Sequence, residues 1–499
     1  MNILDRTKVS SHGPAKGPFR RACKRLLLAL LAAYLLSAAW QVCKPLPAGI
    51  GRSFAVAAAA DTDLLTDITY VDAAGVRHSD QQVFDEVLRL IGQAQRAVLV
   101  DMFLFNDFTG ADAAPGLRPL SDELTRALVE RKRAVPGLQV VVITDPINTL
   151  YGGMPSKHLQ ALRAAGIETV VTDLSRIRAP NPAWSGFWHL CCRWLGNSDR
   201  GGWLASPFGQ GKTTLRSYLA LLNLKANHRK TLVVDSGDGW VGLVTSANPH
   251  DGSSAHGNVA LRFSGQAALD LLQSERAVAA MSGAAWPQAL VSIKPSALPV
   301  GSAGSARVQI LTEGRIRDAL LASIAGAKPG DRLDIAVFYF SHRGLVKEVA
   351  AAQRRGVKIR VLLDPNEDAF GRKKNGIPNR QAALELHEAG VPVRWCDTHG
   401  EQCHAKFMLK RSVAGEAELI VGSANYTRRN LDDYNLETSA RVLAADDSAV
   451  ISRAASYFEQ SWSNTDGRRI SLPYARYADD SRLRYWRYRF TEATGLSSF

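Results

Sequence analysis

Two short stretches of the chain share one pattern, HRKTLVV at 228–234 and HAKFMLK at 404–410. In each stretch a histidine and a lysine stand two positions apart at the start of an apolar run. Because alternate residues of a strand face the same side, each pair is expected to project together from a sheet. The first motif continues to Asp235, whereas Arg411 occupies the corresponding position of the second. The repetition predicts two homologous halves.

Each pair is followed by Ser-Ala-Asn, 18 residues from histidine to serine in the first half and 19 in the second. Two facing halves would present imidazoles, ammonium groups and amides to one small anion, which suits a phosphodiester. One imidazole would attack phosphorus and the other would protonate the leaving alkoxide. The lysines supply the positive charge, so we expect no metal and no other cofactor. The candidate residues are His228, Lys230, Asp235, Ser246, Asn248 and Asn258, then His404, Lys406, Ser423, Asn425, Asn435 and Glu437.

Three further pairs of segments repeat between the halves, and helical stretches alternate with their apolar strands. This alternation predicts sheets covered by helices. The pairs are 97–107 with 333–343, 137–146 with 356–365, and 159–173 with 383–397.

With these motifs the sequence resembles the phospholipase D superfamily over roughly residues 65–490, through a duplicated HxKxxxxD motif. The resemblance implies an α/β fold of two pseudo-symmetric α/β/α sandwich lobes, with the site between them and a phosphohistidine intermediate. It implies that His228 is the nucleophile and that His404 is the acid and then the base. The catalytic set carried over is His228, Lys230, Asn248, His404, Lys406 and Asn425.

Two positions depart from the family pattern. The second half has Arg411 in place of the motif aspartate, and the first half has Ala260 where the second has the carboxylate Glu437. A carboxylate behind an imidazole fixes its tautomer and raises its basicity. We therefore expect Glu437 to serve His404, and the sequence offers no partner for His228. The motif aspartate is expected to be a scaffold residue, so Arg411 need not abolish activity.

The chain begins with a basic segment and an apolar run. Residues 1–25 carry a net charge of +6, and residues 26–43 are uncharged. Eighteen helical residues span about 27 Å, close to one hydrocarbon core. The charge asymmetry predicts a single-pass anchor in the inner (cytoplasmic) membrane, with the N-terminus in the cytoplasm and the body on the periplasmic, extracytoplasmic side. The alternative is a cleaved signal and a secreted body, although small-residue sites at 55–60 lie far beyond the run.

The body divides into a first lobe (65–293), a linker (294–306) and a second lobe (307–465), and the second lobe is followed by a tail (466–499). An aromatic insertion at about 174–222 separates the repeats of the first lobe. It is either a small aromatic satellite core, or a lid or an interfacial membrane-contacting element beside the site. In the tail arginines alternate with aromatic residues, which suits packing on the body, anionic lipid or stacked bases.

The formal net charge of +14 sits mainly at the two ends, because residues 468–499 add +4 and the 442 residues between carry only +4. That distribution argues against a basic nucleic-acid groove. SPFGQGKTT at 206–214 lacks the first glycine of a phosphate loop, and the cysteine–histidine spacing at 396–404 is not interpreted as zinc. We expect at least one disulfide among Cys191, Cys192, Cys396 and Cys403, either within 396–403 or from the insertion.

These features predict a membrane-tethered phospholipase D-type phosphodiesterase or phosphatidyltransferase, with a membrane phospholipid as substrate and an anionic membrane surface as partner. The acceptor is open between water and an alcohol, and the oligomeric state is open as well. The alternatives are a tethered nuclease of the same superfamily, with nucleic acid as a less favoured partner, and an inactive scaffold that binds lipid or a partner.

Overall fold

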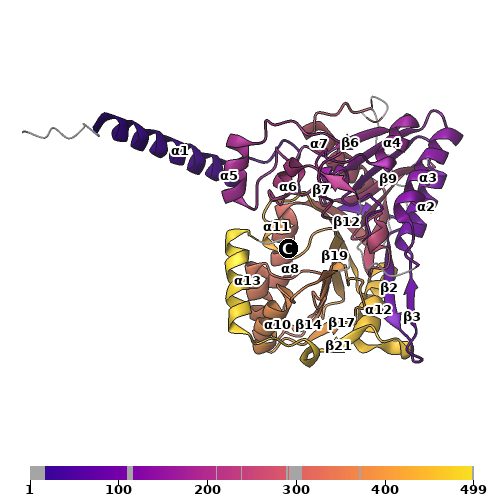
Figure 1. Ribbon diagram of the computed structural model, residues 1–499. Helices are drawn as coiled ribbons and strands as arrows, with labels where there is room; N and C mark the ends of the chain where they lie inside the picture. Colours follow the sequence, from indigo (N-terminus) through magenta and orange to yellow (C-terminus); the bar gives the residue numbers. More distant parts are fainter. Residues whose placement is uncertain are drawn as a thin grey trace, which may run out of the picture.

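The computed structural model describes residues 17–109, 116–209, 211–237, 239–287, 290, 306–369 and 372–496. It contains two large sheets side by side, the first built from the purple half of the chain and the second from the orange half (Figure 1). Residues 1–16 of the predicted basic segment, 294–305 of the predicted linker and 497–499 of the tail lie outside the described residues.

The first sheet has eight strands in the order β3-β2-β11-β10-β9-β4-β5-β6. Strands β4, β5 and β6, at one side of the sheet, are parallel, and β9 runs antiparallel beside β4. The strands are β2 (Asp63–Val71), β3 (Arg77–Asp80), β4 (Ala97–Met102), β5 (Gln139–Thr144), β6 (Glu168–Val171), β9 (Lys230–Ser236), β10 (Gly239–Thr245) and β11 (Asn258–Ser264). The helices of this lobe are α2 (Val83–Gln93), α3 (Leu120–Ala134), α4 (Lys157–Ala164) and α7 (Gln266–Met281).

The second sheet has nine strands in the order β1-β12-β20-β19-β18-β13-β14-β17-β21. They are β1 (Ala57–Ala59), β12 (Ala306–Thr312), β13 (Arg332–Val337), β14 (Lys358–Leu363), β17 (Val393–Cys396), β18 (Lys406–Arg411), β19 (Glu416–Gly422), β20 (Thr438–Ala445) and β21 (Ser471–Pro473). The helices of this lobe are α8 (Gly314–Ala325), α9 (Arg343–Arg354), α10 (Asn379–Glu388), α11 (Arg428–Leu431) and α12 (Ala449–Ser463). Small hairpin strands are β15 (Asp368–Ala369) and β16 (Arg372–Lys373).

Seven strands of each sheet follow the same spatial order, which confirms the predicted pseudo-symmetric fold. The run β2-β11-β10-β9-β4-β5-β6 of the first sheet corresponds to β12-β20-β19-β18-β13-β14-β17 of the second. The three repeated segments found in the sequence supply the parallel strands β4, β5 and β6 and their counterparts β13, β14 and β17. One exchange breaks the symmetry, because β1 precedes the first lobe in sequence but pairs with β12 of the second sheet.

The helices form outer and inner layers. Helices α2, α3 and α4 pack on the outer face of the first sheet, and α8, α9 and α10 pack on the outer face of the second. A central core joins the inner faces of the two sheets with α7 and α12. The two lobes thus share their largest apolar core, and burial of this core holds them together.

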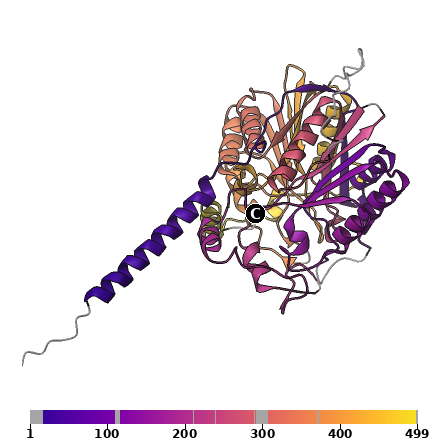
Figure 2. The same cartoon turned by 90° about the horizontal axis from the view of Figure 1, so that it is seen from above.

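The predicted apolar run lies in one long helix, α1 (Gly17–Cys43), which projects away from the body (Figures 1 and 2). It begins nine residues before the predicted span and includes the basic residues at 20–25. Residues Phe19–Cys43 are long and apolar enough to cross a membrane, by length and composition. Most of the leucines of α1 are exposed. An exposed apolar surface of this size is typical of a contact with a protein partner or a membrane.

The insertion of the first lobe and the C-terminal tail both fold into helices. The insertion contains α5 (Pro182–Cys191), β7 (Leu204–Ala205), β8 (Lys212–Thr213) and α6 (Leu215–Leu221), and the tail contains α13 (Arg482–Thr494). The satellite core and the lid or membrane-contacting element both stay predictions for the insertion. Trp188 is buried, whereas Trp194 and Trp203 are exposed.

The motif aspartate is a scaffold residue, as predicted. The carboxylate of Asp235 lies at the far end of β9 and accepts the backbone N–H groups of Gln95, Arg96 and Ala97 at 2.8–3.2 Å. It therefore fixes the start of β4 on β9. Arg411 takes the equivalent place at the far end of β18, where its nearest carboxylate is Asp446 at 3.7 Å.

Replacing these two equivalent residues should have unequal effects. Asp235→Ala leaves three N–H groups near the surface of the core without their acceptor, and we expect it to lower the free energy of unfolding by about 2 kcal/mol or more. Arg411→Ala removes a loose surface pair and should cost less than about 1 kcal/mol. Urea denaturation of the detergent-solubilised full chain measures both. Equal losses in the two variants would contradict the scaffold role of Asp235.

Candidate functional site

Both histidine–lysine pairs lie where a central strand begins. Lys230 and Lys406 are the first residues of β9 and β18, and they pair with Met102 and Val337 at the carboxyl ends of β4 and β13. Each lysine Nζ donates to the carbonyl oxygen of the histidine two residues before it, at 2.7 Å for Lys230 and 2.6 Å for Lys406. The two pairs therefore have the same local geometry.

Backbone hydrogen bonds between the lobes bring the two pairs to one place. The amide of His228 donates to the carbonyl of Leu436 in the second lobe (2.9 Å). The amide of His404 donates to the carbonyl of Gly257 in the first lobe (2.7 Å). Each histidine is thus held by the opposite lobe, and both imidazoles are buried.

The carboxylate that contacts the His228 imidazole of the first lobe belongs to the second lobe. Glu437 lies 3.0 Å from Nδ1 of His228, although it belongs to the second lobe. The expectation that Glu437 serves His404 is therefore wrong, and His228 does have a carboxylate partner. In the sequence each histidine was paired with groups of its own half. Because the two halves face each other, Glu437 of the second half instead contacts His228 of the first, and Asn258 of the first half contacts His404 of the second.

Glu437 is itself held in place by several donors. The hydroxyl of Ser423 and the side-chain amide of Asn430 donate to its carboxylate, and the backbone amide of Thr438 donates in turn to the Ser423 oxygen. Burial alone raises the pKa of Glu437, but His228 and then Lys230 outweigh it and bring the pKa below its usual value. The side chain is therefore an ionised carboxylate that accepts a hydrogen bond from Nδ1–H and leaves Nε2 of His228 as the unprotonated nitrogen.

The structural counterpart of Glu437 in the first lobe is Asn258. Its Oδ1 accepts from Ser246 (3.0 Å) and contacts Nδ1 of His404 (3.2 Å), as Glu437 accepts from Ser423 and contacts His228. The assignment of Ala260 to this position is therefore wrong. It came from matching Asn258 with Asn435, since each lies ten residues after the Asn of its Ser-Ala-Asn motif, but in the structure Asn258 matches Glu437. The site is chemically asymmetric: one imidazole has a carboxylate partner and the other a neutral amide.

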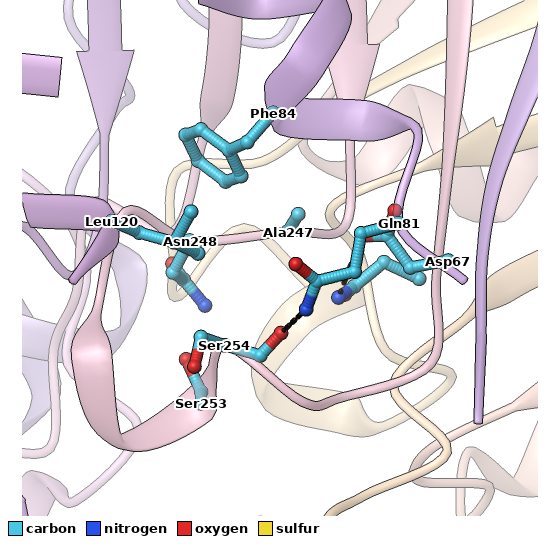
Figure 3. A pocket seen from close by; sticks show the side chains of 9 residues that line it. Asp67, Gln81, Phe84, Leu120, Ala247, Asn248, Ser253 and Ser254 are labelled. Carbon is cyan, nitrogen blue, oxygen red and sulfur yellow. Dashed lines mark hydrogen bonds between the residues drawn. The ribbon is translucent and has the colours of Figure 1, made fainter. Parts of the chain in front are cut away.

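A small pocket lies beside Asn258 and Asn248 (Figure 3). On one side Asp67 approaches the Asn258 amide nitrogen at 3.5 Å, and burial raises the pKa of Asp67 to about 6. An acceptor on the nitrogen side keeps the Asn258 oxygen turned toward His404. Gln81 spans the pocket and donates to the carbonyl of Ser254.

Two aspartates that sequence reasoning did not select support the histidines. Asp145 accepts from the backbone amide of Asn227 (2.7 Å), and Asp364 accepts from that of Cys403 (2.8 Å). Asn227 and Cys403 immediately precede the two histidines. Burial raises the pKa of Asp145 to about 7 and that of Asp364 to about 6. The signal was the repeated Asp-Pro, which closes a buried parallel strand in each half.

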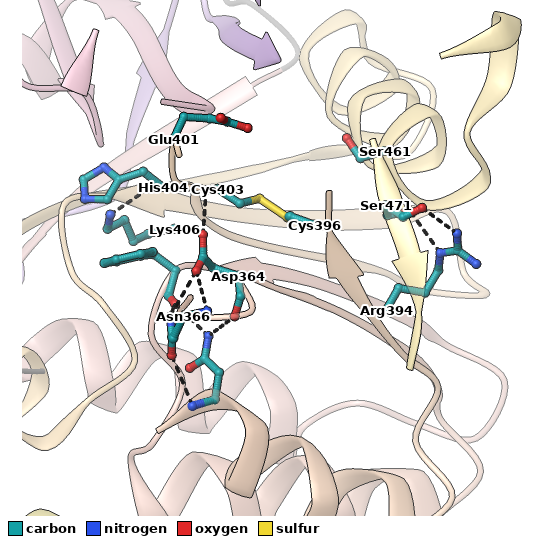
Figure 4. Close-up of a disulfide and its surroundings, with 12 residues drawn as sticks. Asp364, Asn366, Arg394, Cys396, Glu401, Cys403, His404, Lys406, Ser461 and Ser471 are labelled. Atoms are coloured by element: carbon teal, nitrogen blue, oxygen red, sulfur yellow. Dashed lines mark hydrogen bonds between the residues drawn. A yellow bond between two sulfur atoms is a disulfide. The ribbon is translucent and has the colours of Figure 1, made fainter. Parts of the chain in front are cut away.

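A disulfide joins Cys396 to Cys403 beside the second histidine (Figure 4). This confirms the prediction of at least one bridge among the four candidates. Cys191 and Cys192 are joined to each other, so no bridge links the insertion to this loop. Together with Asp364, the bridge fixes the residue before His404 from two sides. Cys396 and Cys403 are the two cysteines of the metal-like spacing at 396–404, and as a disulfide they offer no thiolate to zinc.

An aromatic ring lies against each imidazole. Phe103 follows β4 and its ring centroid lies 4.7 Å from that of His228, and Phe338 follows β13 at 5.1 Å from His404. The lysine Nζ atoms lie over the same rings, at 5.1 Å for Lys230 and 5.5 Å for Lys406. The rings restrict rotation of the imidazoles and exclude water from the lysines. Both positions fall within a repeated segment, but no polar signal distinguishes them in the sequence.

The remaining candidates divide into two groups. Asn248 and Asn425 are buried and follow β10 and β19; Asn248 accepts the amide of Leu104 at 3.2 Å through Oδ1, which turns its NH₂ group away from that contact. Ser246, Ser423 and Asn435 instead bond to protein groups, and Asn435 accepts the amide of Ala226 at 3.1 Å. The serines and Asn435 are therefore structural supports.

Arg229 lies between His228 and Lys230 and points the opposite way, into the lobe interface. It is fully buried and forms ion pairs with Glu275 of α7 (3.2 Å) and Glu313 of the second lobe (2.7 Å). Glu313 also accepts the amides of Gly51 and Glu437. This network ties the backbone under His228 to the other lobe and to the segment that follows α1.

Burial dominates the electrostatics of the empty site. It lowers the pKa of His228 to about 4, although the Glu437 carboxylate opposes the shift. It lowers the pKa of Lys230 to about 7 and that of Lys406 well below its usual value. Burial and then Lys406 also hold the pKa of His404 well below the ordinary value. The site thus combines two buried amines and two buried imidazoles that an anion would stabilise in their protonated forms.

Comparison with known proteins agrees with this geometry. Residues 320–462 match the family described as "Cardiolipin synthase, PLD-like domain", a range that includes His404, Lys406, Asn425 and Glu437. The mitochondrial cardiolipin hydrolases of Xenopus laevis and Homo sapiens are 27% and 29% identical over 147 and 148 residues. Each alignment covers 30% of this chain, and it covers 61% of the frog protein and 50% of the human protein.

A solved structure shares the two-lobed fold. The phosphatidylserine synthase of Haemophilus influenzae aligns over 89% of this chain and 96% of its own, with a TM-score of 0.54 and 10% identity. The fold and the duplicated motif define a two-lobed α/β protein with one pseudo-symmetric site. Residues 320–462 are similar to that PLD-like domain family, and the fold of the whole chain is similar to that of the synthase.

Binding of a simple anion should be coupled to proton uptake. Lys230 is half charged near pH 7 in the empty site and must be charged to hold an anion, so affinity should fall as pH rises above about 7, by up to about tenfold per unit. Calorimetric titration with sulfate, whose charge is constant in this range, measures the effect. Lys230→Arg keeps its charge and should flatten the profile. Equal affinity at about pH 6 and pH 9 in the unmodified chain would refute the coupling.

Proposed function

We propose that the chain is a membrane-tethered phospholipase D-type phosphodiesterase or phosphatidyltransferase that cleaves phospholipids through a phosphohistidine. The observation that carries the proposal is the cross-lobe site. Two buried histidine–lysine pairs meet at the lobe interface, and only His228 has a carboxylate partner. Such a site binds a phosphodiester and supplies both a nucleophile and a proton donor.

In the first step Nε2 of His228 attacks phosphorus and the P–O bond to the leaving alcohol breaks. His404 gives its proton to the departing oxygen, so that the alcohol leaves neutral. Glu437 stabilises the positive charge that forms on the His228 ring, because it is an ionised carboxylate 3.0 Å from Nδ1. Lys230, Lys406 and the amides of Asn248 and Asn425 hold the non-bridging oxygens.

In the second step His404, now neutral, removes a proton from water or an alcohol. The oxygen attacks phosphorus, the N–P bond breaks and the His228 nitrogen regains its lone pair. Asn258 suits His404 for both steps because a neutral amide accepts from Nδ1 without stabilising one charge state strongly. The protein thereby recovers its starting protonation state at the end of the cycle.

The membrane part of the proposal rests on α1 and on the relatives. The exposed apolar helix Phe19–Cys43 supports anchoring in a bilayer, and the basic residues before it support a cytoplasmic N-terminus with the catalytic body on the other side. The relatives named as cardiolipin hydrolases and a cardiolipin synthase-like domain support a phospholipid as substrate. The near-neutral body supports lipid over nucleic acid.

Incubation with mixed phospholipid vesicles tests the reaction. The full chain should release a headgroup alcohol and form phosphatidic acid, and added glycerol should divert product to phosphatidylglycerol if an alcohol is accepted. Mass spectrometry of extracted lipids separates these products. His228→Ala should abolish them, whereas Arg411→Ala is the matched control and should retain them. Degradation of single-stranded DNA without lipid turnover would favour a nuclease instead.

The nucleophile can be identified with a substrate whose leaving group needs no acid. With a p-nitrophenyl phosphodiester, His404→Ala should release one equivalent of p-nitrophenolate per site in a burst and then stall, because the base of the second step is missing. His228→Ala should give no burst. The trapped adduct should be found on the peptide that contains His228. A burst in His228→Ala with the adduct on His404 would reverse the assignment.

A further inference from the structure

Helix α5 packs along the part of α1 that is predicted to lie within the bilayer. The hydroxyl of Tyr34 donates to the carbonyl of Ala183 (3.1 Å), and that of Ser37 donates to the carbonyl of Gly186 (3.0 Å). Gly186 lies so close to Ala38 that a Cβ atom added there would stand 2.8 Å from the alanine Cβ. Small residues at a close helix crossing are typical of packing in membranes.

This contact sets the depth of α5. Tyr34 and Ser37 precede the end of α1 at Cys43 by nine and six residues, which is about 13 Å and 9 Å along the helix axis. If α1 spans a bilayer, α5 lies beside its last turns and cannot remain in bulk water. The outward side chains of α5 suit that depth, because Phe187 and Leu190 are each 48% exposed.

The junction after α1 is folded against the body. The Nζ atom of Lys44 donates to the carbonyl of Ser175 (2.6 Å), the guanidinium of Arg178 donates to the carbonyl of Lys44 (3.0 Å), and the amide of Ala179 donates to Gln41 (2.8 Å). The body therefore keeps one orientation relative to α1. A fixed tether determines which face of the body meets the bilayer.

Helix α13 lies on the same side of the body, beside α5 in both overall views (Figures 1 and 2). Its end touches the start of α5, because a Cβ atom added to Gly495 would lie 1.8 Å from the carbonyl oxygen of Pro180. Three apolar side chains on one face of α13 are more than half exposed: Leu483 (81%), Trp486 (68%) and Phe490 (61%). Arg482 and Arg487 are exposed beside them. An apolar face flanked by arginines is the composition of an interfacial helix on anionic lipid.

Helix α13 is also anchored to the active-site edge of the second sheet. Tyr488 packs against Phe338 and Tyr339 and donates to the carbonyl of Ser341 (3.1 Å), and Phe338 is the ring that contacts His404. On the other lobe, α6 ends seven residues before His228. The apolar surface and the site thus belong to the same side of the two sheets.

We propose that α5 and the exposed face of α13 form an interfacial surface that is embedded in the leaflet next to the body, with Arg482 and Arg487 contacting anionic headgroups. The occupant of this surface is the bilayer that α1 crosses, so the inference rests on the proposed membrane anchoring. The surface would hold the cross-lobe site at a fixed height above the lipid phosphates. Lipid would then reach the site by lateral diffusion.

Spin labels in the full chain test the surface. Single cysteines at Phe187→Cys and Trp486→Cys, in a Cys23→Ser/Cys43→Ser background, are labelled and reconstituted in vesicles of phosphatidylethanolamine and phosphatidylglycerol. Collision rates with oxygen and a nickel chelate should put both labels about 5–10 Å below the phosphates. The matched control is Val413→Cys, a 72% exposed residue in the turn after β18 at the end opposite Lys406, and it should be aqueous.

A label at Leu35→Cys in α1 separates failure of the surface from failure of the anchor. If the Leu35 label is in lipid and the labels at 187 and 486 are in water, the interfacial surface is refuted and the membrane anchoring by α1 is retained. An aqueous Leu35 label would overturn both. Labels at 187 and 486 shielded from both collision reagents would indicate a second copy of the chain in place of lipid. In Arg482→Gln/Arg487→Gln the 486 label should become shallower, and an unchanged depth would refute the headgroup contact.

Discussion

The contact between Glu437 and His228 crosses the lobe interface, and the geometry of the site depends on it. A single lobe supplies an imidazole without its partner, because each histidine meets a side chain of the opposite lobe. The backbone hydrogen bonds from His228 to Leu436 and from His404 to Gly257 also hold each histidine against the opposite lobe. Buried ion pairs of Arg229 reinforce the interface beneath them. Packing of the two sheets on the shared apolar core therefore also completes the site.

Pseudo-symmetry supplies two similar imidazoles, and one substitution makes them different. Asn258 and Glu437 occupy equivalent positions and are held by equivalent serines, yet only one of them is charged. An ionised carboxylate stabilises a cationic ring, whereas an amide orients the ring with little bias between its charge states. The two halves of the site can then divide the roles of nucleophile and proton carrier without any change in backbone geometry.

The sequence was sufficient to predict two repeated halves of strands covered by helices, the two histidine–lysine pairs and the scaffold role of Asp235, because these depend on periodicity and on a motif that occurs twice. It was not sufficient to predict which carboxylate meets which histidine. Counting residues placed Asn258 opposite Asn435, since loops of different length connect the same strands. Asp145 and Asp364 were overlooked because the repeated Asp-Pro that contains them was interpreted only as the end of a buried strand. The Phe103 and Phe338 rings look like ordinary core residues in the sequence.

The pairing of β1 with β12 has a consequence for how the chain reaches this state. The segment directly after α1 finds its hydrogen-bond partners about 250 residues later, at Ala306–Val308, and Gly51 finds its acceptor at Glu313. During vectorial synthesis the first lobe emerges while this segment still lacks its sheet. Strand β1 can complete its pairing only after the second lobe has begun to fold. Contacts of such high sequence separation form late, so folding of the protein ends at the strand that follows α1.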